Sequence, residues 1–175
     1  MSEEYTELGR RAVFCARYEA HTRGAVVVRP EHLILGLLRA DRQLFELCSP
    51  EVNINEIRAS FEWRLSRRRT LDRKSIVQFS KATRRVLDLA KKESHGSGYS
   101  NIGTEHLLAG LIRAERLHRF PLWRTRRRWI SSVFRECGMD PDQILQKIRA
   151  GQLNRRPKAE RVTAALGFFK PIDHD

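Results

Sequence analysis

The chain has 175 residues, of which 41% are hydrophobic and 31% charged, so it can bury a sizeable core. No run of 18 or more apolar residues occurs and the start Met1-Ser2-Glu3-Glu4 is acidic, so we expect a cytoplasmic protein with no membrane-spanning helix, signal peptide or membrane partner. The formal net charge of +13 predicts an acidic partner, with nucleic acid, an anionic surface and an acidic protein as the alternatives.

Apolar residues at helical spacing predict four helices in the N-terminal part of the chain. The first carries the apolar stripe of residues 5–16, the second carries that of 33–38, and the third is the short segment 45–48. Asn53 starts the fourth helix, because Glu56 three residues later completes a capping box. Together these segments predict one unit of four helices.

A second unit of four helices is predicted further along the chain. Segments 79–90, 107–112 and 133–137 repeat the first three helices, and Asp140-Pro141 begins the last. The halves are a true sequence repeat, because residues 5–42 align without a gap on the segment 74 positions later. The aligned pairs that keep the same residue include Arg10/Arg84, Arg11/Arg85, Ala16/Ala90, Glu19/Glu93, His21/His95, Gly24/Gly98, Glu31/Glu105, His32/His106, Leu33/Leu107, Gly36/Gly110, Leu37/Leu111 and Arg39/Arg113.

The sequence shows no convincing alternating strand pattern, so the predicted fold class is all-α, with eight helices in two four-helix units related by a pseudo-two-fold axis. The predicted organisation is a first repeat at 1–66, a basic linker at 67–78, a second repeat at 79–151 with a basic insertion near 117–132, and a tail at 152–175 that we expect to be disordered.

Two motifs point to a known family. Each repeat opens with an aromatic residue and a hydroxyl residue before an Arg-Arg helix, and the second continues as Ile102-Gly103-Thr104-Glu105-His106-Leu107-Leu108-Ala109-Gly110-Leu111-Ile112-Arg113. Over nearly all of residues 5–150 the chain resembles the Clp amino-terminal repeat domain of the ClpA, ClpB and especially ClpC unfoldases. That resemblance implies a module that receives substrates or adaptors for an ATP-driven unfoldase ring and its peptidase.

The sequence contains no G-x-x-x-x-G-K-[ST] loop for ATP. We therefore expect a non-catalytic accessory or adaptor of the Clp system that binds no cofactor and whose partners are a Clp ATPase or peptidase, or substrate proteins. No Ser-His-Asp or Cys-His signature indicates catalysis. The repeated histidines lack zinc-helix spacing, so no metal site is predicted. The three cysteines, also without metal or redox spacing, are interpreted as buried apolar residues.

The resemblance to ClpC-like members also implies a receptor for phosphoarginine. A hydroxyl and the amides of a helix start would take the phosphate, and a glutamate would take the guanidinium. The matching residues are Thr6 with Glu31 in the first repeat, and Ser80 with Thr104 and Glu105 in the second. The alternative is that the hydroxyls are ordinary helix caps and the glutamates ordinary first-turn acids. The second repeat fits better, because Arg29-Pro30 replaces Gly-Thr in the first.

The basic insertion supplies a competing prediction. It interleaves arginine with aromatic rings, a combination that can neutralise phosphates and stack on bases, so the alternative function is a basic nucleic-acid-associated protein on a Clp-like scaffold. Two other interpretations stay open: the tryptophans pack on the core, or the insertion docks on an unfoldase or peptidase. The candidate residues of this patch are Trp123, Arg124, Arg126, Arg127, Arg128 and Trp129.

Overall fold

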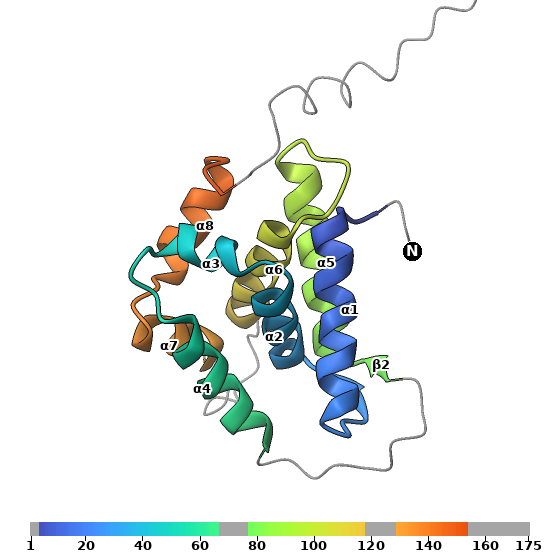
Figure 1. The fold of residues 1–175 in the computed structure, drawn as a ribbon. Coiled ribbons are helices and arrows are strands. Elements are labelled where there is room, and N and C mark those ends of the chain that lie inside the picture. The colour runs from blue at the N-terminus through green and yellow to red at the C-terminus, as the bar shows by residue number, and fades with distance from the viewer. Residues whose placement is uncertain (1–3, 67–76, 118–128, 154–175) are drawn as a thin grey trace, which may run out of the picture.

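The computed structural model describes residues 4–66, 77–117 and 129–153, and these form eight helices (Figure 1). This confirms the all-α prediction. The first four helices are α1 (Glu7–Thr22), α2 (Pro30–Ala40), α3 (Arg42–Cys48) and α4 (Ile54–Ser66), and the second four are α5 (Lys81–Gly96), α6 (Thr104–Arg116), α7 (Trp129–Glu136) and α8 (Pro141–Arg149). The sequence reading missed two short strands, β1 (Val27–Val28) and β2 (Gln78–Phe79).

Short polar side chains fix where several helices begin. Asp140 caps α8 by accepting the amide hydrogen of Asp142, and Asn53 accepts the amide of Glu56 ahead of α4, as the sequence predicts. Asp41 does the same for α3, because its carboxylate accepts the amide of Leu44 at 3.2 Å. Each of these bonds joins residues two or three positions apart, so these helix starts are marked by local interactions.

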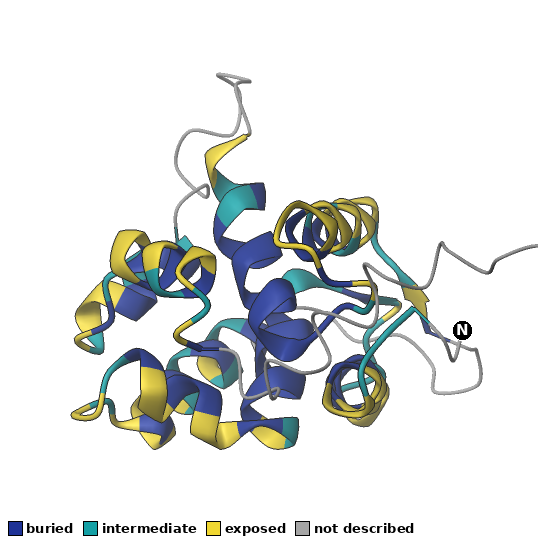
Figure 2. Ribbon diagram, turned by 90° about the horizontal axis from the view of Figure 1, so that it is seen from above, coloured by how far each residue is buried: buried dark blue, intermediate teal, exposed yellow. Residues whose placement is uncertain are grey.

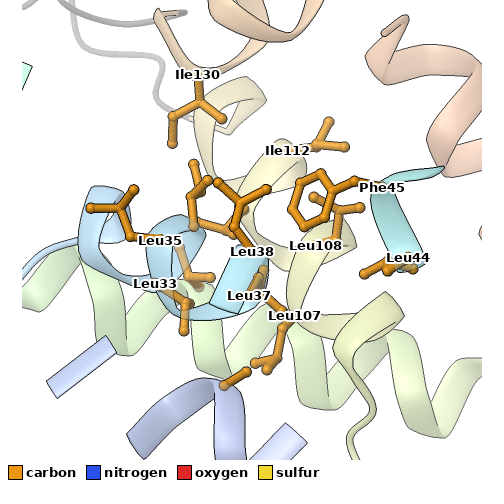
Figure 3. Close-up of a cluster of buried hydrophobic side chains, with 14 of the residues drawn as sticks. Leu33, Leu35, Leu37, Leu38, Leu44, Phe45, Leu107, Leu108, Ile112 and Ile130 are labelled. Carbon is orange, nitrogen blue, oxygen red and sulfur yellow. The ribbon is translucent and has the colours of Figure 1, made fainter. Parts of the chain in front are cut away.

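Helices α2 and α6 lie at the centre, with α1 and α5 on one side and α4, α7 and α8 on the other (Figure 1). Figure 2 shows buried residues gathered at the centre and exposed residues on the outward faces of the surrounding helices. Every residue of the segment 31–38 in α2 is buried. Its leucines meet α6, α3 and α7 through Leu107, Leu108, Ile112, Phe45 and Ile130 (Figure 3). The core is thus shared by both repeats rather than divided between them.

The packing of α1 on α2 and of α5 on α6 depends on two glycines. A Cβ atom on Gly36 would lie 2.4 Å from the carbonyl oxygen of Ala12, and one on Gly110 would lie 2.5 Å from that of Val86. Each glycine lets two helix backbones touch, and the two contacts correspond at the 74-residue offset. The interface between the first and second helix is therefore built in the same way in both repeats.

The two repeats are joined by short parallel pairings that cross between them. In one, β1 pairs with β2, with Val27 opposite Gln78 and Val28 opposite Phe79. In the other, Tyr5 forms a parallel bridge with Ile102. Each pairing connects the segment before the first helix of one repeat to the segment before the second helix of the other. This reciprocity is what a two-fold relation requires, but the pseudo-two-fold axis itself stays a prediction.

Two further observations concern the predicted cysteines and the membrane. Cys15 and Cys48 are buried, Cys137 is half-buried, and none of the three forms a disulfide. Burial raises the pKa of the Cys15 and Cys137 thiols, which favours their protonated form. Among the helices that the structure describes, none has the length and apolar character needed to cross a bilayer.

Candidate functional site

The structure pairs the starts of α1, α2, α5 and α6 across the two repeats, whereas the sequence predicts pairs within each repeat. The amide of Thr6 donates to the carbonyl of Ile102 at 3.0 Å, which sets the start of α1 beside the start of α6. The amide of Ser80 donates to the carbonyl of Val28 at 2.9 Å, which sets the start of α5 beside the start of α2. The first helix of each repeat is 16 residues long, so about 24 Å separates its start from the segment that follows it.

The expected partners within each repeat are therefore replaced by partners across the repeats. Thr6 shares its end of the molecule with Gly103 and Glu105, and we name these three residues the Thr6 site. Ser80 shares its end with Arg29 and Glu31, and we name these three residues the Ser80 site. The expected pairs Thr6 with Glu31 and Ser80 with Glu105 are not the pairs that the fold brings together.

The two hydroxyl groups differ in what they can still bind. The Thr6 hydroxyl accepts the amide hydrogen of Gly9 at 3.0 Å, and within 4–66, 77–117 and 129–153 its own hydrogen meets no acceptor. In the second repeat Thr83 replaces Gly9, and its hydroxyl donates to the carbonyl of Val28 at 2.7 Å. The hydrogen of Ser80 is then directed to the Thr83 oxygen, 2.9 Å away. Of these two hydroxyl groups, that of Thr6 is the one left able to donate to a ligand.

Backbone amides add to the binding capacity of the Thr6 site. The first amides of an α-helix have no acceptor within the helix. Those of Glu7 and Leu8 have none elsewhere in the described part of the chain, whereas the next two are taken by the side chain and carbonyl of Thr6. Together with the positive end of the α1 dipole, they favour a negatively charged group such as a phosphate.

The two duplicated glutamates also differ. A Cβ atom on Gly103 would lie 2.3 Å from either carboxylate oxygen of Glu105, so this carboxylate folds back over the glycine. In the other repeat Arg29 occupies the glycine's position, and its Cβ blocks that arrangement. Both carboxylates are buried, with Glu31 6% and Glu105 9% exposed. Burial raises the pKa of the Glu31 carboxyl, opposed by its own backbone amide and by Arg29. The Ser80 site has therefore diverged from the Thr6 site at two of its three positions.

Thr104, the remaining predicted ligand residue, lies inside the fold. It is 3% exposed, and its hydroxyl donates to a carboxylate oxygen of Asp41 at 2.6 Å. The hydroxyl hydrogen thus ties the start of α6 to the start of α3. We leave the Thr104 side chain out of the candidate binding site for this reason.

Comparison with known proteins agrees with this arrangement of helices. The family described as the Clp repeat (R) N-terminal domain matches residues 4–124. The chain belongs to this family. A ClpA homolog of Guillardia theta, an ATP-binding subunit of ATP-dependent Clp protease, is 34% identical over 115 residues, which is 65% of this chain and 14% of the relative. An uncharacterized protein of Mycobacterium tuberculosis is 31% identical over 113 residues, 44% of its length. The chain therefore spans less than half of these curated relatives.

Solved Clp and Hsp104 N-terminal domains share the fold of this Clp repeat domain. The Hsp104 N-terminal domain from Candida albicans superposes with a TM-score of 0.67 and 17% identity over 87% of this chain and 93% of that one. The ClpD N-terminal domain from Arabidopsis thaliana gives 0.61 and 22% over 87% and 97%. Identities this low establish the fold and leave the ligand to be argued from the site.

Both duplicated histidines, His32 and His106, act as helix caps in this Clp repeat domain. The Nδ1 atom of His32 accepts the amide hydrogen of Arg29 at 2.9 Å, and that of His106 accepts the amide of Gly103 at 3.0 Å. Each is 1% exposed. In the described ranges no group of three or more His, Cys, Asp or Glu side chains is arranged to hold a metal ion. The duplicated histidines are thus explained by capping.

His32 is expected to make the domain sensitive to mild acid. Burial and nearby Arg23 and Arg29 lower the pKa of His32 to about 4. In the unfolded chain this imidazole takes up a proton near pH 6.5. The contribution of neutral His32 to the free energy of unfolding is therefore complete above that pH, and about 3 kcal/mol is lost as the pH falls to about 4. Urea unfolding of wild type and His32→Asn, which keeps an acceptor near Nδ1, measures it. The stability advantage of wild type should shrink by this amount between pH 7.5 and 4.

The control for this experiment is His21→Asn, because His21 is exposed on α1. It should leave the free energy of unfolding at pH 7.5 within about 0.5 kcal/mol of wild type, as is usual for an exposed position. If the free energy of unfolding falls equally with pH in wild type and in His32→Asn, the His32 imidazole does not cause the acid sensitivity.

Trp129 is the one residue of the predicted basic patch that lies within the described part of the chain. Trp129 begins α7, where its ring lies 4.9 Å from that of Phe61 and the guanidinium of Arg64 covers it at 4.9 Å. It packs on the core instead of offering a free face for a base. The other candidates, Trp123, Arg124, Arg126, Arg127 and Arg128, lie outside the described residues. Nucleic-acid binding through them stays a prediction.

Proposed function

We propose that this Clp repeat domain is a non-catalytic receptor that binds a substrate or adaptor protein at the Thr6 site. One observation carries the proposal: the Thr6 hydroxyl hydrogen and the amides of Glu7 and Leu8 have no acceptor in the described chain, at a helix start bridged to the Glu105 segment. Such donors suit a phosphate, and a carboxylate beside them suits a cation.

The ligand class that combines these two charges is a phosphorylated guanidinium, such as phosphoarginine in a protein. Its phosphate would take the α1 donors, and its remaining N–H groups would donate to the Glu105 carboxylate in parallel hydrogen bonds. The Ser80 site supports this ligand less well, because its hydroxyl hydrogen is directed to Thr83 and Arg29 stands where the other site has a glycine. We therefore assign the ligand to the Thr6 site.

Isothermal calorimetry with free phosphoarginine tests the proposal on the whole chain. We expect binding with one ligand per chain, and much weaker binding of arginine or inorganic phosphate, because each of these satisfies only half of the site. If inorganic phosphate binds as tightly as phosphoarginine, the site recognises an anion and not the guanidinium. Absence of phosphoarginine binding at about 1 mM ligand, weaker than about 4 kcal/mol, would refute the assignment.

The partner is proposed from the relatives. The curated relatives include ATP-binding subunits of Clp protease, and one matched structure is described as a peptide from the EAEC T6SS Sci1 SciI protein. These support a role in passing proteins to a Clp ATPase or its peptidase. A pull-down from native lysate, with and without nuclease, should recover such a protein in both samples. Recovery of nucleic acid alone, lost after nuclease, would favour the alternative function.

A further inference from the structure

The exposed side of α1 carries two aromatic rings that the fold does not bury. Phe14 is 69% exposed and Tyr18 is 46% exposed, and they stand four residues apart, so their side chains are neighbours on the helix. The opposite side of α1 supplies the core residues Ala12, Ala16 and Ala20. Single exposed apolar residues are ordinary, but an adjacent aromatic pair on a rigid helix at the outside of the molecule (Figure 1) is a candidate contact surface.

The internal repeat carries charged residues at the positions that match the aromatic pair. The positions 74 residues later in α5 are Asp88 and Lys92, and both are exposed. The helix that packs in the equivalent way on α6 thus carries charges where α1 carries Phe14 and Tyr18. The aromatic pair is therefore a feature of the first repeat alone, and burial in the core gives no account of it.

Arginines border the pair and hold one ring in place. The guanidinium of Arg39 lies over the Tyr18 ring at 4.7 Å and pairs with the buried carboxylate of Glu19 at 3.2 Å. Arg11, three residues before Phe14, is exposed beside it. The one exposed acidic residue of α1 is Glu7, two turns before Phe14, since Glu19 is buried. We name Arg11, Phe14, Tyr18 and Arg39 the aromatic face.

We propose that the aromatic face docks an amphipathic helix of a partner protein whose apolar stripe is flanked by acidic residues. The two rings would insert between the apolar side chains of that helix, and the arginines would meet its carboxylates, which is the division of roles found at interface hot spots. A protein fits better than nucleic acid because Arg39 already covers one face of the Tyr18 ring, leaving it unable to stack between two bases.

This surface is separate from the Thr6 site. Phe14 lies eight residues beyond Thr6 along α1, or about 12 Å along the helix axis. Loss of one function is therefore distinguishable from loss of the other. A Phe14→Ala, Tyr18→Ala double variant should bind phosphoarginine as wild type does, and a Thr6 site variant should still bind through the aromatic face.

The test uses two synthetic helical peptides of about 18 residues with the same leucine stripe, one bordered by glutamates and one by lysines. Fluorescence anisotropy should show binding of the acidic peptide to the full chain, with at least about tenfold weaker binding to the Phe14→Ala, Tyr18→Ala variant. The matched control, Asp88→Ala with Lys92→Ala, should bind as wild type. Because all four positions are exposed, the thermal midpoints of both variants should stay within about 3 °C of wild type.

Several outcomes would overturn the proposal. These are equal binding of the basic peptide, unchanged affinity in the aromatic variant, or no binding of the acidic peptide at about 1 mM. A duplex DNA probe or a vesicle of phosphatidylglycerol that binds in its place, and that depends on Phe14 and Tyr18, would assign the aromatic face to nucleic acid or to a membrane surface.

Discussion

Phosphoarginine binding is expected to fall by about 10- to 100-fold in Glu105→Gln and to stay unchanged in Glu31→Gln. The glutamine keeps the shape of the side chain but cannot form the charge-assisted hydrogen bonds to a guanidinium, which contribute about 1.5 to 3 kcal/mol. Only Glu105 belongs to the end of the molecule where Thr6 leaves a hydroxyl hydrogen and two helix amides open. Calorimetry of the two variants side by side measures the difference.

Substitution of the hydroxyl residues Thr6 and Ser80 tests the same arrangement independently. Thr6→Ala should weaken binding together with Glu105→Gln, whereas Ser80→Ala should not, because the Ser80 hydrogen is already directed to Thr83. The control for a nearby charge is Glu7→Gln, an exposed acid one residue from Thr6. Loss of binding in Thr6→Ala and Glu31→Gln, with Glu105→Gln unaffected, would restore the pairing within each repeat and contradict the arrangement across the repeats.

Gly36→Ala is expected to destabilise the domain by about 2 to 3 kcal/mol, despite the higher helix propensity of alanine. Its Cβ would lie 2.4 Å from the carbonyl oxygen of Ala12 and 2.6 Å from the amide nitrogen of Ala16. Both neighbours are backbone atoms of α1, so no side-chain rotation relieves the overlap and the two helices must move apart. For a domain of this size the thermal midpoint should fall by about 5 to 10 °C in calorimetry.

Gly96→Ala is the matched control, because Gly96 is also helical and nothing lies within 4 Å of its added Cβ. It should leave the midpoint unchanged or raise it slightly through the propensity of alanine. A midpoint in Gly36→Ala equal to that of the control would mean that α1 and α2 can separate at little cost. Gly110→Ala should repeat the loss, because its Cβ would lie 2.5 Å from the carbonyl of Val86.

Elements set by local interactions are predicted well from the sequence. The apolar spacing and the caps at Asn53 and Asp140 lie within a few residues of the helices that they define, so they are legible along the chain. The bounds of the third helices were less accurate. The sequence predicts a helix at 133–137, but α7 begins at Trp129, inside the predicted insertion, because Glu115 of α6 accepts the amides of Ile130 and Ser131. That cap comes from a residue 15 positions away.

The pairing of the sites was beyond sequence reasoning for the same physical reason. Two-residue strands carry no alternating pattern, and the bridge between Tyr5 and Ile102 joins segments that are far apart along the chain. One signal in the sequence was available: Gly9 and Thr83 differ at the 74-residue offset, and this difference decides which hydroxyl stays open. Its meaning needs the carbonyl of Val28, which only the fold brings near.

By itself, the sequence determined the two repeats, their eight helices and the family, because these depend on periodicity, caps and motifs within short stretches of chain. The tertiary structure decided which residues face one another. It joined Thr6 to the Glu105 segment, placed the Thr104 hydroxyl on Asp41 and left Phe14 exposed. Such outcomes depend on distances between segments far apart in the chain, and those distances exist only once both repeats close around one core.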